Sequence, residues 1–246
     1  MDASFENLPM DAQLGHDIPS GLARLLRAIS TTTLGSSQQE NFRKREAVLK
    51  FREAPVFDTQ DHIAYIGSGE DWQFPAALGA GTIDMVDPVF SDSTTAMRML
   101  RNVQKIDGNA RLGYPGKDCI ISAVVDIGEG PKPIRLRLIA TEAALYDPGY
   151  PLDGVLEFLG PTKIDGGESS PVLPNIAKKL RPGARVINFD FSEQALPNNS
   201  GWLVQGGEKP SVLRVADNKL VISLAEAALE ARKNFFDHMP SSLGKR

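Results

Sequence analysis

Two glycines and a carboxylate, about twenty positions apart, form the stretch of this sequence best suited to bind a ligand. The turn consists of Gly67, Ser68 and Gly69, after an apolar run at residues 63–66. Asp87 ends a second apolar run at residues 83–86. Glycine lets the backbone turn sharply and approach a ligand closely, and a carboxylate at the tip of the next parallel strand can accept hydrogen bonds from a ribose. The spacing predicts a strand, turn, helix and strand unit that binds a nucleoside.

The elements that must position this unit predict an α/β fold. Apolar runs at residues 134–140, 152–159 and 186–191 are typical of buried strands and are separated by segments of helix length. This alternation is typical of a mainly parallel, Rossmann-like sheet with helices on both faces. The runs at 119–127 and 134–140 also predict a β-hairpin. A helix is expected between Ser170 and the segment Arg181-Pro182-Gly183.

The two ends of the chain are expected to add to this core. A hairpin of residues 212–215 with residues 220–224 should add an antiparallel strand at the C-terminal end. Residues 1–60 should form an N-terminal helical extension, and residues 61–246 the Rossmann-like domain.

The second helix of the extension, residues 38–53, is rich in basic side chains. These are Arg43, Lys44, Arg45, Lys50 and Arg52. Glutamates are interleaved with them, which favours a solvated helix surface over a binding face. We therefore expect the extension to do no more than cap or cover a site.

Composition excludes several classes of protein. With 246 residues and 41% hydrophobic content, the chain can bury a sizeable core. The net charge of −4 provides no general attraction to nucleic acid or to an anionic membrane, so neither partner is expected. No apolar run is long enough to cross a bilayer, and the first residues lack a signal-peptide pattern, which predicts a cytoplasmic location.

Metal and thiol chemistry find no support in the residue pattern. The single cysteine, Cys119, leaves no internal disulfide and no cysteine-based metal cluster. His16, His62 and His238 stand alone, without the spacing of zinc ligands. We predict no metal site and assign no catalytic residue.

The order of these parts resembles the class I S-adenosylmethionine-dependent methyltransferases. The resemblance rests on the glycine turn, the acidic strand end, the segment LDGVLEFL at 152–159 and the phrase Leu180-Arg181-Pro182-Gly183. It covers roughly residues 61–224. It implies a Rossmann-like fold, S-adenosylmethionine as cofactor, and methyl transfer to a small molecule that the sequence does not identify.

The resemblance also implies a set of cofactor contacts. They are Tyr65, Gly67, Ser68, Gly69, Asp71, Asp87 and Glu142. Glu142 lies where this fold often places an acid near the adenine amino group. One position departs from the family pattern, because Tyr65 stands where an acid usually helps to hold the methionine ammonium. Either Glu70 or Asp71 replaces that acid from the other side of the turn, or the methionine end is bound weakly.

A dinucleotide is the rival ligand of such a turn. Its G-x-G-x-x-G pattern needs a third glycine, where this chain has Trp72, which we expect to be a packing residue. Glu70 and Asp71 would lie near the pyrophosphate, and like charges about 4 Å apart repel by about 4 kcal/mol at intermediate dielectric. S-adenosylmethionine has no phosphate and is cationic, so the turn favours it. A non-catalytic methyltransferase-like scaffold stays open as an alternative, and a dinucleotide-dependent oxidoreductase is less favoured.

Overall fold

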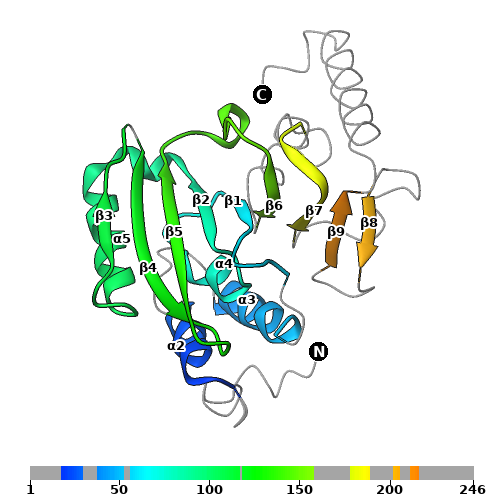
Figure 1. The fold of residues 1–246 in the computed structure, drawn as a ribbon, viewed down its shortest axis with the longest axis horizontal. Helices are drawn as coiled ribbons and strands as arrows, with labels where there is room; N and C mark the ends of the chain where they lie inside the picture. The colour runs from blue at the N-terminus through cyan, green and yellow to red at the C-terminus, as the bar shows by residue number, and fades with distance from the viewer. Residues whose placement is uncertain are drawn as a thin grey trace, which may run out of the picture. The chain divides into compact units, whose positions relative to one another are not determined.

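The computed structural model describes residues 18–29, 38–52, 56–116, 118–157, 178–188, 202–205 and 211–215. The chain divides into two compact units, Met1–Glu142 and Ala143–Arg246. Figure 1 shows the strands and helices of both units. The expected boundary between residues 60 and 61 stays a prediction.

The first unit contains a mixed sheet with the strand order β3-β4-β5-β2-β1. Its strands are β1 (His62–Ile66), β2 (Thr82–Val86), β3 (Arg111–Gly113), β4 (Cys119–Asp126) and β5 (Pro131–Ile139). β2 pairs in parallel with β1 on one side and with β5 on the other. β4 is antiparallel to both β5 and β3. The predicted parallel neighbours and the predicted hairpin are therefore confirmed.

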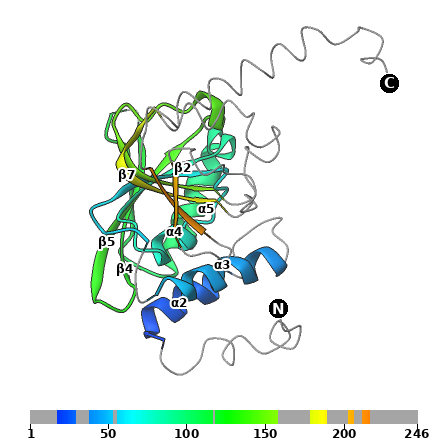
Figure 2. The ribbon, with the colours of Figure 1, turned by 90° about the vertical axis from the view of Figure 1, so that its right-hand side faces the viewer.

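The described helices of this unit lie on one face of the sheet (Figures 1 and 2). They are α2 (Ser20–Ile29), α3 (Gln38–Lys50), α4 (Gln73–Ala77) and α5 (Ser93–Gln104), with a 3₁₀ turn η1 at Pro88–Ser91. Asp92 caps the start of α5 by accepting a hydrogen bond from the Thr94 amide at 2.9 Å.

The core lies between these helices and the sheet. Tyr65 and Met85 are register partners, as are Met85 and Leu138, so the three side chains point to the same face. The Tyr65 ring packs edge-on against Phe74 of α4 with centroids 6.3 Å apart, which identifies this face as the helix-covered one. Side chains on it are almost fully buried, and their burial from water is the main force that holds the layers together.

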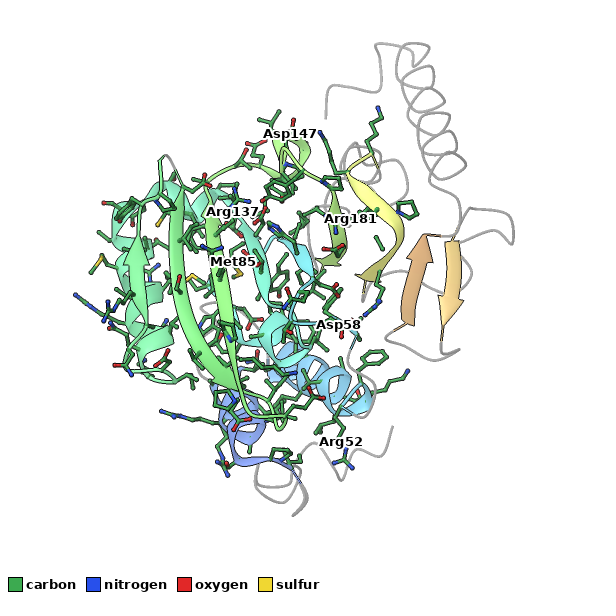
Figure 3. The ribbon with its side chains drawn as sticks, viewed as in Figure 1. Arg52, Asp58, Met85, Arg137, Asp147 and Arg181 are labelled. Carbon is green, nitrogen blue, oxygen red and sulfur yellow. The ribbon has the colours of Figure 1, made fainter. Side chains whose placement is uncertain are left out.

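The opposite face of the same strands carries a buried charge. Asp84, in the middle of β2, has no exposed surface. Arg137 projects from the neighbouring strand β5 (Figure 3) and donates to both Asp84 oxygens, at 3.0 and 3.1 Å. The His62 ring lies 2.8 Å from Asp84 through Nε2, and Arg137 also donates to Asp118 at 3.1 Å. Burial lowers the pKa of Arg137, but the charge and hydrogen bonds of Asp84 raise it overall.

The second unit has the strand order β6-β7-β9-β8. Its elements are the 3₁₀ turn η2 (Ala143–Leu145) and the strands β6 (Leu152–Glu157), β7 (Leu180–Asn188), β8 (Trp202–Gln205) and β9 (Ser211–Val215). β6 and β7 are parallel, while β9 is antiparallel to both β7 and β8. Parallel strands with an antiparallel C-terminal hairpin confirm the predicted α/β, Rossmann-like class.

The predicted partner strand of residues 212–215 is wrong. The hairpin is formed by β9 with the preceding strand β8, and both edges of β9 are occupied, so residues 212–215 do not pair with residues 220–224. The latter lie outside the described residues, as does most of the helix expected after Ser170.

The phrase Leu180-Arg181-Pro182-Gly183 does not end a helix but lies within β7. The pairing of β6 with β7 shifts register here, between Leu152 and Gly154. Pro182 cannot donate to a strand ladder, and Gly183 adopts a left-handed φ of 81°. These residues therefore suit a bulge at the start of the strand.

We predict that Asp84→Asn destabilises the protein strongly. The substitution removes the buried negative charge that the Arg137 guanidinium contacts through two hydrogen bonds, and breaking a buried ion pair costs about 3–5 kcal/mol. The free energy of unfolding, measured by urea denaturation, should fall by that amount. Asp118→Asn is the control, because Asp118 is 45% exposed and exposed pairs contribute about 0–1 kcal/mol. Equal losses in the two variants would contradict this account.

Candidate functional site

The carboxyl ends of three parallel strands meet at one edge of the first unit's sheet. Ile66, Val86 and Ile139 are register partners across β1, β2 and β5. The Gly67 amide donates to the Val86 carbonyl at 3.0 Å, and the Asp87 amide donates to the Ile139 carbonyl at 3.1 Å. The residues after each strand are thereby tied to the neighbouring strand. Ligands of open α/β sheets bind at such an edge.

The turn after β1 depends on its two glycines. Gly67 and Gly69 adopt left-handed φ values of 64° and 51°, which residues other than glycine rarely adopt. Ser68 between them is buried, and its hydroxyl donates to the Gly69 carbonyl at 3.2 Å. A Cβ atom built on Gly69 would meet nothing within 4 Å. Gly69 is thus required by the backbone conformation, and the space beside it is open to a ligand.

Asp87 joins the two strand ends through its carboxylate. Oδ2 accepts a hydrogen bond from the Gly69 amide at 2.9 Å, and Oδ1 accepts one from the Val89 amide at 2.9 Å. The second bond caps η1, so Asp87 also has a structural role at the start of this turn. A carboxylate has about four acceptor positions, so each oxygen keeps capacity for a further donor. The half-buried Asp87 can therefore cap the turn and still receive a ribose hydroxyl.

Glu142 follows β5 at the same end of the sheet. Its side chain is exposed. An adenine contact for this residue stays a prediction, as do the ligand contacts of the other candidate residues.

Tyr65 and Asp71 meet beneath the turn. Tyr65 is 1% exposed, and its hydroxyl donates to Asp71 Oδ2 at 3.3 Å. Asp71 is also 1% exposed. Asp71, six residues after Tyr65, thus places a buried carboxylate against the Tyr65 hydroxyl, and whether it replaces the acid expected at position 65 stays a prediction.

Lys44 of α3 is a buried partner of Asp71 that the sequence did not predict. Its Nζ atom lies 2.5 Å from Asp71 Oδ2, and its side chain is 6% exposed. It also lies 5.9 Å from the centre of the Phe74 ring. The prediction that the basic residues of this helix are solvated is therefore wrong for Lys44, while the expectation that the extension only caps or covers a site stays a prediction.

The burial of Lys44 follows from the helix face on which it lies. Asn41, Lys44, Ala47 and Val48 are the buried positions described on α3, and their spacing is that of one helical face. Two of the four are polar, so apolar periodicity does not reveal this face in the sequence, and the buried lysine is compensated by the Asp71 carboxylate, since an unpaired buried charge is costly.

Glu70, the second acid of the turn, also has an internal partner. Its carboxylate accepts a hydrogen bond from Arg98 Nε of α5 at 2.7 Å and a second one from Arg98 Nη2. The hydrogen bond and the charge of Glu70 raise the pKa of Arg98. The Glu70 side chain is 9% exposed and that of Arg98 is 45% exposed, so solvent screens this pair more than the buried one.

These ion pairs change the electrostatic argument about the ligand. Both acids of the turn are neutralised by cations of the same unit, so their repulsion no longer counts against a pyrophosphate. The short helix after the turn still disfavours a pyrophosphate, because phosphates bind best at the N-terminus of a longer helix. α4 has only five residues, and Trp72, at its start, is fully buried and provides no side-chain cap. The prediction that Trp72 is a packing residue is confirmed.

Two buried polar atoms beside the turn have no hydrogen-bond partner within the described part of the chain. They are Asp71 Oδ1 and Trp72 Nε1. Buried polar atoms are nearly always paired, so these two atoms are exceptions next to the glycine turn.

Other chemistries gain little from the structure. The sequence indicated that His62 stands alone, but in the structure its ring contacts Asp84. Burial raises the pKa of the Cys119 thiol, which disfavours the thiolate. Within the described ranges, no group of three or more His, Cys, Asp or Glu residues could hold a metal ion. No helix in those ranges is long and apolar enough to span a membrane, and the cytoplasmic location stays a prediction.

Comparison with known proteins gives structural neighbours only. No protein-family model and no curated protein matches the chain. Among solved structures, YjhP from E. coli is 14% identical, with a TM-score of 0.38 over 72% of this chain and 60% of its own.

Two further neighbours are methyltransferases. CalS10, a SAM-bound amino pentose methyltransferase from Micromonospora echinaspora, is 13% identical, with a TM-score of 0.36 over 79% of this chain and 84% of its own. Magnesium protoporphyrin IX methyltransferase from Synechocystis PCC 6803 is 11% identical, with a TM-score of 0.38 over 81% of this chain and 97% of its own. This likeness does not indicate an activity for this chain, so a function has to be inferred from the residues of the candidate site.

We predict that Gly69→Ala destabilises the protein by about 1–2 kcal/mol, the usual cost of a side chain in the left-handed region. The cost should be conformational, because the added methyl group meets no atom. Gly69→Asn should cost less, since asparagine tolerates this conformation better. Thermal or urea unfolding of the two variants measures both values. A larger loss for asparagine than for alanine would show that packing, and not backbone conformation, requires the glycine.

Proposed function

We propose that this protein binds S-adenosylmethionine at the edge formed by the glycine turn and Asp87, and transfers its methyl group to a small molecule. The observation that carries the proposal is the Asp87 carboxylate, which is held by two backbone amides at the end of β2 beside an open glycine turn. A fixed carboxylate with spare acceptor capacity is suited to bind the two hydroxyls of a ribose.

The residues present fit the nucleoside half of such a ligand well. Gly69 leaves open space where an adenosyl group could approach the backbone. Glu142 is exposed at the end of β5, on the same edge, where its carboxylate could accept a hydrogen bond from an adenine amino group. This chain would therefore orient the ligand through hydrogen bonds from the ends of β2 and β5.

The methionine half would depend on Asp71. Its Oδ1 atom is buried and accepts no hydrogen bond from the described residues, so it could receive an ammonium group. Tyr65 holds the other oxygen and fixes the carboxylate in one orientation. Such positioning matters because the acceptor and the methyl group must be aligned for reaction.

The cofactor itself would supply the activated methyl group, as cofactors generally supply the difficult chemistry. The chain would contribute alignment and the exclusion of water, so no general base is assigned. Neither the acceptor nor a residue that binds it is identified.

A second function is favoured by one observation. Asp71 and Glu70 already hold the cations Lys44 and Arg98. A site whose acids are internally neutralised could bind a nucleoside without holding a methionine group. The protein would then be a non-catalytic binding protein with a methyltransferase-like fold.

We predict that Asp87→Ala weakens the binding of both adenosine and S-adenosylmethionine by tenfold to a hundredfold. A charge-assisted hydrogen bond contributes about 1.5–3 kcal/mol, and each 1.4 kcal/mol is about tenfold in affinity. Calorimetric titration measures both affinities. Asp92→Ala is the matched control, because Asp92 is also an aspartate that caps a helix but has no expected ligand contact. Equal affinities in the wild type and the Asp87 variant would exclude Asp87 as the ribose ligand.

The affinity ratio between S-adenosylmethionine and adenosine separates the two functions. Methyl transfer requires that the methionine group be held, so the wild-type protein should bind S-adenosylmethionine at least tenfold more tightly, the effect of about one charge-assisted hydrogen bond. Asp71→Asn should bring the ratio close to one, and Glu70→Gln should leave it unchanged. A ratio near one in the wild type, with adenosine still bound, would favour the binding protein.

A further inference from the structure

We propose that Lys44 is a specificity-determining residue, which competes with the α-ammonium group of the ligand for the Asp71 carboxylate. This inference rests on the proposed function, since it concerns the methionine half of the same site. It gives α3, and hence the N-terminal helical section, a direct part in ligand selection.

The geometry makes Lys44 an internal substitute for a ligand ammonium. Its Nζ atom lies 2.5 Å from Asp71 Oδ2, a distance typical of a short charge-assisted hydrogen bond. Both side chains are nearly inaccessible to solvent, at 6% and 1% exposure. A primary ammonium group on a flexible carbon chain thus already contacts the acid that accepts the Tyr65 hydrogen bond.

The carboxylate is nevertheless only half used. Lys44 and Tyr65 both donate to Oδ2, whereas Oδ1 is buried and accepts no hydrogen bond from the described residues. A single lysine therefore satisfies the charge of Asp71 but not its hydrogen-bonding capacity. A second ammonium group at Oδ1 would bring two cations onto one carboxylate, so the ligand and Lys44 oppose each other there.

The competition affects only ligands that carry an ammonium group. Adenosine has none, so its binding should be indifferent to Lys44. S-adenosylmethionine must weaken the Lys44 contact or displace it, so its affinity includes that cost. Lys44 should therefore lower the affinity ratio between the two ligands, and a change that moves α3 away from the turn should raise it.

The test is calorimetric titration of adenosine and S-adenosylmethionine against the full-length protein and its Lys44 variants. Lys44→Met removes the charge and keeps most of the side-chain volume. It should raise the affinity ratio about tenfold to a hundredfold, the range expected for one charge-assisted hydrogen bond. Lys44→Arg keeps the charge and should leave the ratio close to wild type. Lys50→Met is the matched control, because Lys50 is an exposed lysine of the same helix.

Lys44→Met leaves the Asp71 charge buried without its lysine and could prevent folding. Lys44→Gln, which keeps a hydrogen-bond donor without the charge, then provides the same test and should also raise the ratio. In the double variant with Asp71→Asn, which removes both charges, the gain should disappear, because Lys44 acts through Asp71.

Each remaining outcome counts against the inference. An unchanged ratio in Lys44→Met and Lys44→Gln would show that Lys44 is structural only. A lower ratio would show that Lys44 binds the ligand, for instance by contacting the carboxylate of its methionine group. A wild-type protein that does not bind adenosine would overturn the proposed function itself, and this inference with it.

Discussion

The parallel register of β1, β2 and β5 is the constraint on which the candidate site depends. Because Ile66, Val86 and Ile139 are aligned, the glycine turn, Asp87 and Glu142 all follow strands that end at one edge. The Asp87 carboxylate then joins the turn after β1 to the 3₁₀ turn after β2 through two amide hydrogen bonds. Positioning by backbone amides makes the carboxylate a fixed feature of the sheet edge, independent of any ligand.

Beneath that edge, the charges of the turn are balanced from within the unit. Lys44 pairs with Asp71, and Arg98 pairs with Glu70, so the two acids carry little net field. The Lys44–Asp71 pair is the more buried of the two, so solvent and salt weaken it less than the Arg98–Glu70 pair. The choice of ligand therefore depends less on the overall charge of the turn than on whether a ligand can compete for Asp71.

Local sequence patterns predicted the individual strands of the parallel core and the glycine turn, because each of these depends on residues close together in the chain. The ion pairs were not predictable in this way. Lys44 and Asp71 are 27 residues apart, and Asp84 and Arg137 are 53 apart. Lys44 shares its buried helix face with a second polar residue, Asn41, so apolar periodicity did not identify it as buried. The strand partner of β9 was not predicted because alternation of apolar and polar residues predicts a strand without specifying its neighbour. The start of β7 was not predicted because Pro182 is untypical of a strand interior.

We propose that the edge beside the glycine turn is a nucleoside site held by Asp87. A crystal structure of the protein with S-adenosylhomocysteine, the product form of the cofactor, tests this assignment. We expect the adenosyl group beside Gly67 and Gly69, with ribose hydroxyls within hydrogen-bond distance of the Asp87 carboxylate. A ligand bound elsewhere, with Asp87 in contact only with the Gly69 and Val89 amides, would contradict this assignment.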